Sequence, residues 1–462
     1  MSPRVLAWLG ALAAALTFAA TVRGQSPHNK LQHRIDAAGP GDTVFVPPGT
    51  FDGDLTLPKR LALIGSAGSV LRGSGNGTCL TITADSCVVR DLVVERSGRD
   101  LTREDAAILL KSSHNILKRL TIRDALFGIY LLSSHGNLIE DNSISEIHGL
   151  DLGQRGNGIH VWNSHENTFL GNAITGTRDG LYFLYANRTR AERNSASQLR
   201  YGLHYMYSDS NEFVGNVFVD NLAGAAIMYS TDIRFRHNLF VQNRGFSSYG
   251  ILFQDCHNVL ADSNIIADNV VGMFFEAATD NVFRHNIIAR NEIALTMFQN
   301  SQGNAFSENN FVDNVNALVI VGKRTDSRWS MNGRGNFWSD YDGYDLDGDG
   351  VGDVPLRIQN VFEYLEGKFP NTRLYLYSPV AQALASATKA FPIVEITHEE
   401  DPYPLMRPAE LTTIPASALS RRMTDAQAEQ SPGPLWLACG VPVCLLAAAG
   451  WSTRRLLKRR IP

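Results

Sequence analysis

A histidine and two methionines in the middle of the chain carry donor atoms that suit a soft metal ion. His204 and Met206 lie two residues apart in the run GLHYMYS, and Met228 follows 22 residues after Met206. In a β-strand, residues two apart point to the same side, so His204 and Met206 would share one face. An imidazole combined with thioethers suits Cu(I) better than zinc or calcium. These residues predict a Cu(I) site, provided that residues 22 apart are neighbours in space.

A second interpretation fits the same residues. Methionine and aromatic side chains fill gaps in apolar packing, so a covering segment would also account for them. His160 lies two repeat units before His204, which is about 10 Å at strand spacing. His160 would therefore be a second, separate binding position for the ion and not a co-ligand of the first site.

The elements that position these residues are units of an internal repeat. Each unit opens with Gly and has Asn fourteen residues later, and from Gly158 onward the units start 22, 22, 22, 26 and 22 residues apart. A fixed period of this size is typical of a solenoid, in which each unit stacks on the next. The units begin at Gly128, Gly158, Gly180, Gly202, Gly224, Gly250 and Gly272.

Apolar residues alternate within each unit, as they do in strands. The positions one, three and eleven after each Gly are apolar in every unit, so we expect them to point inward. Stacked Asn side chains can hydrogen-bond from unit to unit, and Asn tolerates the left-handed backbone of tight turns. Three short strands per unit predict an all-β fold, a right-handed parallel β-helix whose equivalent residues stack about 4.8 Å apart. A short N-terminal cap helix over residues 31–38 and a C-terminal extension with a helix over residues 378–391 complete this prediction.

The positions two and four after each Gly would face outward, yet they are mostly aromatic, His or Met. An apolar outward face is either a binding surface or a face that another segment covers. We therefore expect a binding face that includes Tyr130, Trp162, Tyr182 and Phe274.

A run of carboxylates after the repeats resembles a calcium-binding loop. Asp345, Asp347, Asp349 and Asp353 occupy positions 1, 3, 5 and 9 of such a loop, and a Gly at position 6 permits the tight turn. Leu356 stands at position 12, where an EF-hand loop has Glu. A structural Ca²⁺ site and an acidic turn without a ligand both remain open.

Composition and charge bound the function. The net charge of −4 gives no indication of nucleic-acid binding. Polysaccharide cleavage on a β-helix needs two or three carboxylates on one outward face, whereas the outward columns offer Glu276 without an acidic neighbour. We therefore expect no enzyme activity. A carbohydrate-binding or polysaccharide-modifying protein and a metal-free docking scaffold are the alternatives.

The five cysteines do not form a disulfide framework. Cys79 and Cys87 lie in strand-like runs, where we expect thiols in the core. Cys439 and Cys444 lie in an apolar tail.

The two ends of the chain indicate export. Arg4, an apolar run and then small residues are typical of a secretory signal. Residues 434–452 are apolar, near the minimum length for one membrane crossing, and the basic flank favours a cytoplasmic C-terminus. We expect an exported, periplasmic protein anchored to the inner membrane by this segment; a buried helix and a sorting tail removed after export are the alternatives. The expected segments are a signal peptide (1–24), a cap with irregular first coils (25–125), regular coils (126–332), a C-terminal cap with the acidic loop and helical extension (333–410), a linker (411–433), the transmembrane helix (434–452) and a basic tail (453–462).

Four stretches of the chain resemble the NosD family. These stretches are AAGPGDTVFVPPGTFDG, the Gly/Asn repeats, GNFWSDYDGYDLDGDGVGD, and SPVAQALASATKAFP together with DPYPLMRP. The resemblance covers residues 28–408 and is most specific in the FWSDYDGYDLDGDG run.

The resemblance implies a role in the maturation of nitrous oxide reductase. NosD-like proteins work with the membrane ABC transporter NosF/NosY and help to supply copper for the copper–sulfur cluster of the reductase. The copper lipoprotein NosL is the expected upstream partner. The chain would then be a non-enzymatic factor with Cu(I) as its cargo, and sulfur stays open as another cargo. The choice of His204, Met206 and Met228 as ligands comes from residue type and spacing and not from the family.

Overall fold

The computed structural model describes residues 27–145, 147–245, 248–322, 324–358 and 399–410. Among these residues, no helix has both the length and the apolar character that a membrane crossing requires. The predicted signal peptide, the helix over residues 378–391, the linker, the transmembrane segment and the basic tail lie outside the described residues.

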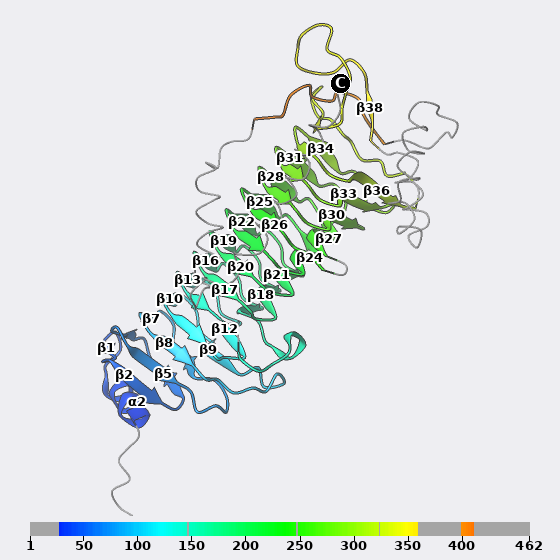
Figure 1. The fold of residues 1–462 in the computed structure, drawn as a ribbon. Coiled ribbons are helices and arrows are strands. Elements are labelled where there is room, and N and C mark those ends of the chain that lie inside the picture. Colours follow the sequence, from blue (N-terminus) through cyan, green and yellow to red (C-terminus); the bar gives the residue numbers. More distant parts are fainter. Residues whose placement is uncertain (1–26, 146, 246–247, 323, 359–398, 411–462) are drawn as a thin grey trace, which may run out of the picture. The chain divides into compact units, whose positions relative to one another are not determined.

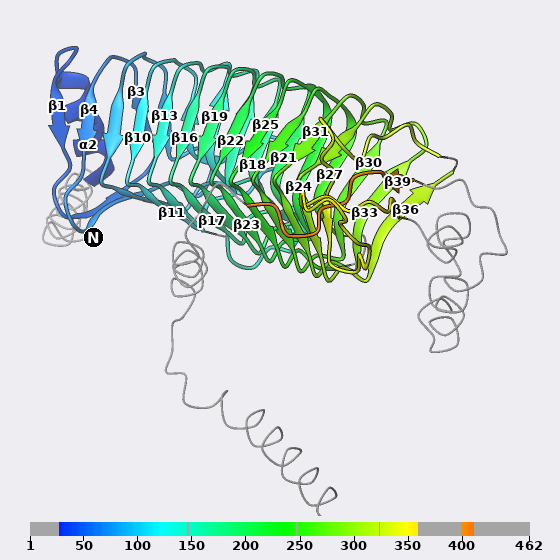
Figure 2. The same cartoon turned by 90° about the horizontal axis from the view of Figure 1, so that it is seen from above.

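The described chain winds into three parallel sheets, and each coil contributes one strand to each sheet (Figure 1). Figure 2 shows the coils side by side from β1 to β36. The predicted right-handed parallel β-helix is therefore confirmed. Sheet A contains β1 (Thr43–Phe45), β4 (Ala62–Ile64), β7 (Val88–Arg90), β10 (Ile116–Lys118), β13 (Leu138–Glu140), β16 (Thr168–Leu170), β19 (Arg190–Glu192), β22 (Glu212–Val214), β25 (Arg234–Arg236), β28 (Leu260–Asp262), β31 (Val282–Arg284) and β34 (Ala305–Ser307).

Sheets B and C follow the same order along the chain. Sheet B contains β2 (Gly49–Asp52), β5 (Ser69–Arg72), β8 (Val93–Glu95), β11 (Thr121–Arg123), β14 (Ser143–Ile144), β17 (Ala173–Thr175), β20 (Ser195–Ser197), β23 (Val217–Val219), β26 (Leu239–Val241), β29 (Ile265–Ala267), β32 (Ile287–Ala289), β35 (Asn310–Val312) and β37 (Phe337–Trp338). Sheet C contains β3 (Leu55–Leu57), β6 (Leu80–Ile82), β9 (Ala106–Leu110), β12 (Phe127–Leu132), β15 (Ile159–Trp162), β18 (Asp179–Leu184), β21 (Tyr201–Met206), β24 (Ala223–Thr231), β27 (Tyr249–His257), β30 (Val271–Glu276), β33 (Ile293–Phe298) and β36 (Asn316–Val321).

The three columns that were predicted to point inward are buried in every unit. Their rings stack along the axis of the coil, as between Phe213 and Phe235, whose ring centroids are 5.0 Å apart. Close packing of these columns is the main source of stability, because apolar area removed from water stabilises the fold in proportion to that area. Because successive residues of a strand point to opposite faces of the sheet, the residues of sheet C between these buried columns point outward.

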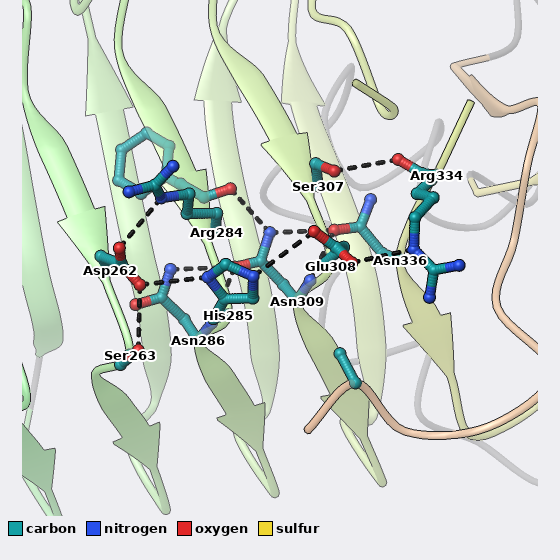
Figure 3. Close-up of polar contacts among 12 residues, drawn as sticks. Asp262, Ser263, Arg284, His285, Asn286, Ser307, Glu308, Asn309, Arg334 and Asn336 are labelled. Atoms are coloured by element: carbon teal, nitrogen blue, oxygen red, sulfur yellow. Dashed lines mark hydrogen bonds and ion pairs between the residues drawn. The ribbon is translucent and has the colours of Figure 1, made fainter. Parts of the chain in front are cut away.

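The predicted asparagine column forms a continuous ladder inside a turn. The side-chain oxygen of Asn216 accepts hydrogen bonds from the backbone N–H and the side-chain amide of Asn194, at 3.0 and 2.9 Å. The side-chain amide of Asn216 in turn donates to Asn238. Figure 3 shows the last rungs at Asn286, Asn309 and Asn336. The ladder satisfies buried backbone donors that the turns would otherwise leave unpaired. The ladder comprises Asn142, Asn172, Asn194, Asn216, Asn238, Asn264, Asn286, Asn309 and Asn336.

Caps close both ends of the described β-helix. Helix α2 (Pro27–Ala37) buries Leu31 and Ile35 at the start of the core, in the region where a cap helix was predicted. At the other end, β38 (Leu356–Arg357) pairs antiparallel with β39 (Glu400–Asp401). Glu399 accepts a hydrogen bond from the Trp329 indole N–H, and Asp401 accepts one from the Trp338 indole N–H.

The first coils belong to the same three sheets as the regular repeat. Strands β1 to β3 contribute to sheets A, B and C, and they lie within residues 25–125, where the sequence predicted a cap and irregular first coils. Their partners in sheet C are Leu55 with Leu80, Leu80 with Ile108, and Ile108 with Ile129, so successive steps of 25, 28 and 21 residues conceal the period.

Candidate functional site

Sheet C brings the predicted soft ligands together. Met206 on β21 and Met228 on β24 are register partners, and His204 lies opposite Ala226. Neighbouring strands lie about 4.8 Å apart, and side chains two residues apart share a face. All three side chains are half-buried on the outward face of the sheet. We refer to His204, Met206 and Met228 as the His–Met–Met cluster.

An ionised carboxylate holds the imidazole of His204 in place. His204 Nδ1 is 2.8 Å from Oδ2 of Asp179, and the His204 side chain is 12% exposed. The ring of Tyr182 meets the imidazole edge-on, with ring centroids 4.8 Å apart, and Tyr201 does the same at 5.1 Å. The imidazole is therefore fixed on two sides by aromatic rings and at Nδ1 by a carboxylate.

Asp179 is shared between His204 and an arginine. Arg200 donates from Nε to Oδ1 at 2.8 Å and from Nη2 to Oδ2 at 2.5 Å. Burial acts to raise the pKa of Asp179, but the hydrogen bonds from His204 and Arg200 outweigh it and hold the pKa below its usual range. Sequence reasoning missed both residues. Asp179 stands directly before the Gly of its unit, and its partner His204 belongs to the next unit.

His160 differs from His204, although both belong to the same outward column. Its ring lies between those of Tyr130 and Tyr182, with both centroid distances 4.5 Å. Asn157 donates from its side-chain amide to His160 Nδ1 at 3.1 Å. Burial lowers the pKa of His160 to about 3, so its ring is neutral at ordinary pH.

Tyr130 and His160 are buried, so this part of the outward face is covered by another segment, which was one of the two alternatives for it. Tyr130 is buried in a cluster with Phe127 and Ile147, and Leu150 packs against this cluster. The chain between β14 and β15, which includes the short 3₁₀ helix Leu152–Gln154, thus covers the first part of the face. This covering segment is an insertion that makes its unit longer than the others. Its contacts with sheet C therefore do not recur in the other units.

The other members of the predicted binding face lie on three different strands of sheet C, β15, β18 and β30. Trp162 is 38% exposed, whereas Tyr182 and Phe274 are half-buried. Tyr182 lies beside His204, while Phe274 packs against Tyr249 with ring centroids 4.9 Å apart. Their role in binding stays a prediction.

Three stacked tyrosines border the His–Met–Met cluster and were not predicted. Tyr185, Tyr207 and Tyr229 follow Leu184, Met206 and Met228 directly, and their ring centroids are 5.5 and 5.0 Å apart. All three are exposed and have a left-handed backbone, which bulky residues seldom adopt. No repeating residue type reveals this column, because the other units place different residues there. Those residues are Ser133, Asn163, Asp255 and Ala277.

The acidic loop gathers three of its four predicted ligands. Ligand oxygens of Asp345, Asp347 and Asp349 all lie within 4.8 Å of one another. Asp353 is not part of this group and accepts a hydrogen bond from the backbone N–H of Leu346. Backbone N–H groups also donate to each of the other three carboxylates. Carboxylate oxygens in this arrangement suit Ca²⁺, which stays a prediction.

The thiols of the described residues are poor candidates for a metal site. Cys79, Cys87 and Cys256 are free and buried, as expected for the first two. Burial raises the pKa of Cys79 and of Cys256 to about 12, so both stay protonated. Because thiolate is the form of cysteine that binds metals, the described sulfur donors on the outward face are thioethers.

Comparisons with solved structures find chains of low sequence identity. The mannuronan C-5 epimerase AlgE4 A-module of Azotobacter vinelandii is 14% identical, with 68% of this chain and 96% of that chain covered and a TM-score of 0.41. The catalytic domain of a GH87 alpha-1,3-glucanase in complex with tetrasaccharides is 13% identical, with 69% and 68% covered and a TM-score of 0.47.

Comparisons with sequences are more specific. The model of the family described as "Periplasmic copper-binding protein (NosD)" matches residues 145–343, a range that contains the His–Met–Met cluster and Asp179 and ends before the acidic loop. A protein of Pseudomonas aeruginosa named "Probable ABC transporter binding protein NosD" is 32% identical over 412 residues, which cover 86% of this chain and 94% of that protein. A protein of the same name from Stutzerimonas stutzeri is 28% identical, with 78% and 86% covered. The chain therefore belongs to the NosD family of periplasmic copper-binding proteins.

Proposed function

We propose that this chain is a non-enzymatic maturation factor that binds Cu(I) at the His–Met–Met cluster and delivers it for nitrous oxide reductase. The observation that carries the proposal is the register of β21 and β24, which places Met206 beside Met228 with His204 on the same face. One imidazole and two thioethers form a soft ligand set, which favours Cu(I) over zinc or calcium.

The surroundings of the His–Met–Met cluster suit a copper ion that is bound reversibly and passed on. Half-buried thioethers keep the ion partly shielded from water while the outward face remains accessible to a partner. Thioethers stay neutral at every working pH, so binding and release of the ion need no protonation at sulfur. A copper carrier must bind the ion and still leave it accessible to the next protein. Ligands on an outward sheet face suit both requirements.

The partners follow from the family. Its relatives in Pseudomonas aeruginosa and Stutzerimonas stutzeri are named as ABC transporter binding proteins. We propose that this chain works with the transporter NosF/NosY, receives copper from the lipoprotein NosL, and supports assembly of the copper–sulfur centre of nitrous oxide reductase.

An anaerobic Cu(I) titration against a chromophoric competitor tests the binding step. The full chain should be used with Cys439→Ser and Cys444→Ser, so that thiols of the apolar tail do not take up copper. We expect His204→Ala to weaken binding by about tenfold or more, equivalent to about 1.4 kcal/mol. The control His135→Ala, which changes an imidazole outside the His–Met–Met cluster, should bind as tightly as the parent.

Three results would replace the proposal. Absence of Cu(I) binding by the parent would favour a metal-free docking scaffold, and equal affinity of the parent and His204→Ala would favour a different copper site. Turnover of uronic-acid polymers by the purified chain would favour a polysaccharide-modifying protein. Delivery is tested separately, since cells that carry His204→Ala with Met206→Ala should produce nitrous oxide reductase deficient in copper.

A further inference from the structure

We infer that Asp179 is a positioning residue that selects the tautomer of His204 and thereby makes Nε2 the copper-binding atom. The inference rests on the proposed function and adds to it a residue that does not touch the ion. Asp179 is on β18, one rung before His204 on β21, and its side chain is 1% exposed.

The direction of the hydrogen bond determines the tautomer. An ionised carboxylate can only accept, so the 2.8 Å contact between His204 Nδ1 and Asp179 Oδ2 requires the proton on Nδ1. A neutral imidazole carries one N–H proton, which leaves a free lone pair on Nε2. Metal-binding histidines commonly donate their other ring N–H to a carboxylate in this way.

Arg200 fixes the orientation of the carboxylate. Its Nε and Nη2 donate to different oxygens of Asp179, and its guanidinium lies 4.5 Å above the ring of Tyr201. A two-pronged contact of this kind defines the plane of the carboxylate as well as its charge. Arg200 also approaches His204 Nδ1 at 3.3 Å, but this nitrogen already donates to the closer Asp179 oxygen.

Neighbouring histidines show the opposite arrangement. The side-chain amide of Asn157 donates to Nδ1 of His160. Nδ1 of His135 accepts the backbone N–H of His165, and Nδ1 of His165 accepts the backbone N–H of Asn187. In these three rings the proton is placed on Nε2, so Nε2 has no free lone pair. Of these four histidines, His204 alone presents a bare Nε2.

Asp179→Asn keeps the size of the side chain and changes the hydrogen bond that it makes to His204, so it tests the tautomer of His204 apart from local packing. In one of its two orientations the substituted amide places its NH₂ where Oδ2 lies, and this NH₂ then donates to His204 Nδ1. The proton then moves to Nε2, as a carboxylate-to-amide change beside a catalytic histidine is known to cause. We expect Cu(I) affinity to fall about 10- to 100-fold, the usual effect of changing such an outer residue.

The tautomer can be read without copper. Long-range ¹H–¹⁵N spectra of the metal-free chain, with ¹⁵N-labelled histidine, report which ring nitrogen carries the proton. The His204 signals are identified by their loss in His204→Gln. We expect the Nδ1–H form in the wild type and the Nε2–H form in Asp179→Asn. The control Glu166→Gln, which changes an exposed carboxylate that pairs with Arg188, should alter neither the His204 spectrum nor the copper affinity.

The outcomes separate the two proposals. An Nε2–H tautomer of His204 in the wild type overturns the inference, and this measurement needs no variant at position 179 to fold. Copper affinity of a folded Asp179→Asn within twofold of wild type also overturns it. If His204→Ala binds Cu(I) as tightly as wild type, the proposed copper site fails, even when the tautomer is as expected. A tautomer change together with weakened binding supports both.

Discussion

Met206 and Met228 are register partners on adjacent strands of sheet C, so the two thioethers lie one rung apart on its outward face. This relationship follows from a repeat length of 22 residues between their units, which superimposes the same position of successive coils. His204, two residues before Met206, completes a donor set from just two strands. The rigidity of the coil stack then determines the geometry of the cluster.

Replacing one thioether should weaken copper binding without weakening the fold. Leucine has nearly the shape of methionine, so Met206→Leu and Met228→Leu keep the apolar packing and remove the sulfur. We expect each variant to lose about tenfold in Cu(I) affinity, or about 1.4 kcal/mol, in an anaerobic competition titration. Met331→Leu, which makes the same change outside the cluster, is the control. Loss of affinity in the control alone would mean that another methionine binds the ion.

His160 should make the protein less stable in mild acid. Its pKa is about 3 in the folded chain, compared with 6.5 without burial, so the unfolded state binds the proton first. Below pH 6.5 protonation therefore favours unfolding. Between pH 6 and pH 4 the free energy of unfolding should fall by about 1.4 kcal/mol per pH unit through this group.

His160→Phe removes the titrating imidazole, and with it this pH dependence of stability, and keeps a ring between Tyr130 and Tyr182. Urea unfolding at several pH values should show a flatter pH dependence for His160→Phe than for the wild type. Loss of the Asn157 contact adds a pH-independent cost. His257→Gln changes an exposed imidazole and should follow the wild type. Parallel curves for wild type and His160→Phe would show that His160 is protonated in the folded state.

The asparagine ladder should respond strongly to one missing rung. Asn216→Ala leaves the backbone N–H and the side-chain amide of Asn194 without their shared acceptor, and Asn238 loses a donor. Each unsatisfied buried group costs about 1–3 kcal/mol, so the variant should lose several kcal/mol of stability, as measured by urea unfolding. Asn300→Ala removes an amide that bonds to Ala277 at an exposed position and should lose much less. Equal losses in both variants would contradict a special role for the ladder.

The repeat was sufficient to predict the fold because the same positions are apolar in every unit. The positions one, three and eleven after each Gly are apolar in every unit, and burial of those columns defines the β-helix. The same reasoning predicted that Met206 and Met228 are neighbours. It predicted irregular coils before residue 125 but not which of their positions are equivalent, since steps of 25, 28 and 21 residues hide partners such as Leu80 and Ile108.

Contacts that break the period could not be predicted in this way. Ile147 belongs to an insertion, and its packing against Tyr130 depends on how that loop folds back over sheet C. Asp179 and His204 belong to different columns of successive units, so their contact needs both the rung spacing and the side-chain directions. Such contacts give His204 and His160 different hydrogen-bond partners at Nδ1.

X-ray absorption at the copper edge tests the central claim most directly. The full chain with Cys439→Ser and Cys444→Ser should be loaded with Cu(I) under anaerobic conditions. We expect the copper ion to be coordinated by one imidazole nitrogen and two sulfur atoms, with one sulfur lost in Met228→Leu and the nitrogen lost in His204→Ala. Coordination without sulfur, or coordination that is unchanged in both variants, would contradict copper binding at the His–Met–Met cluster.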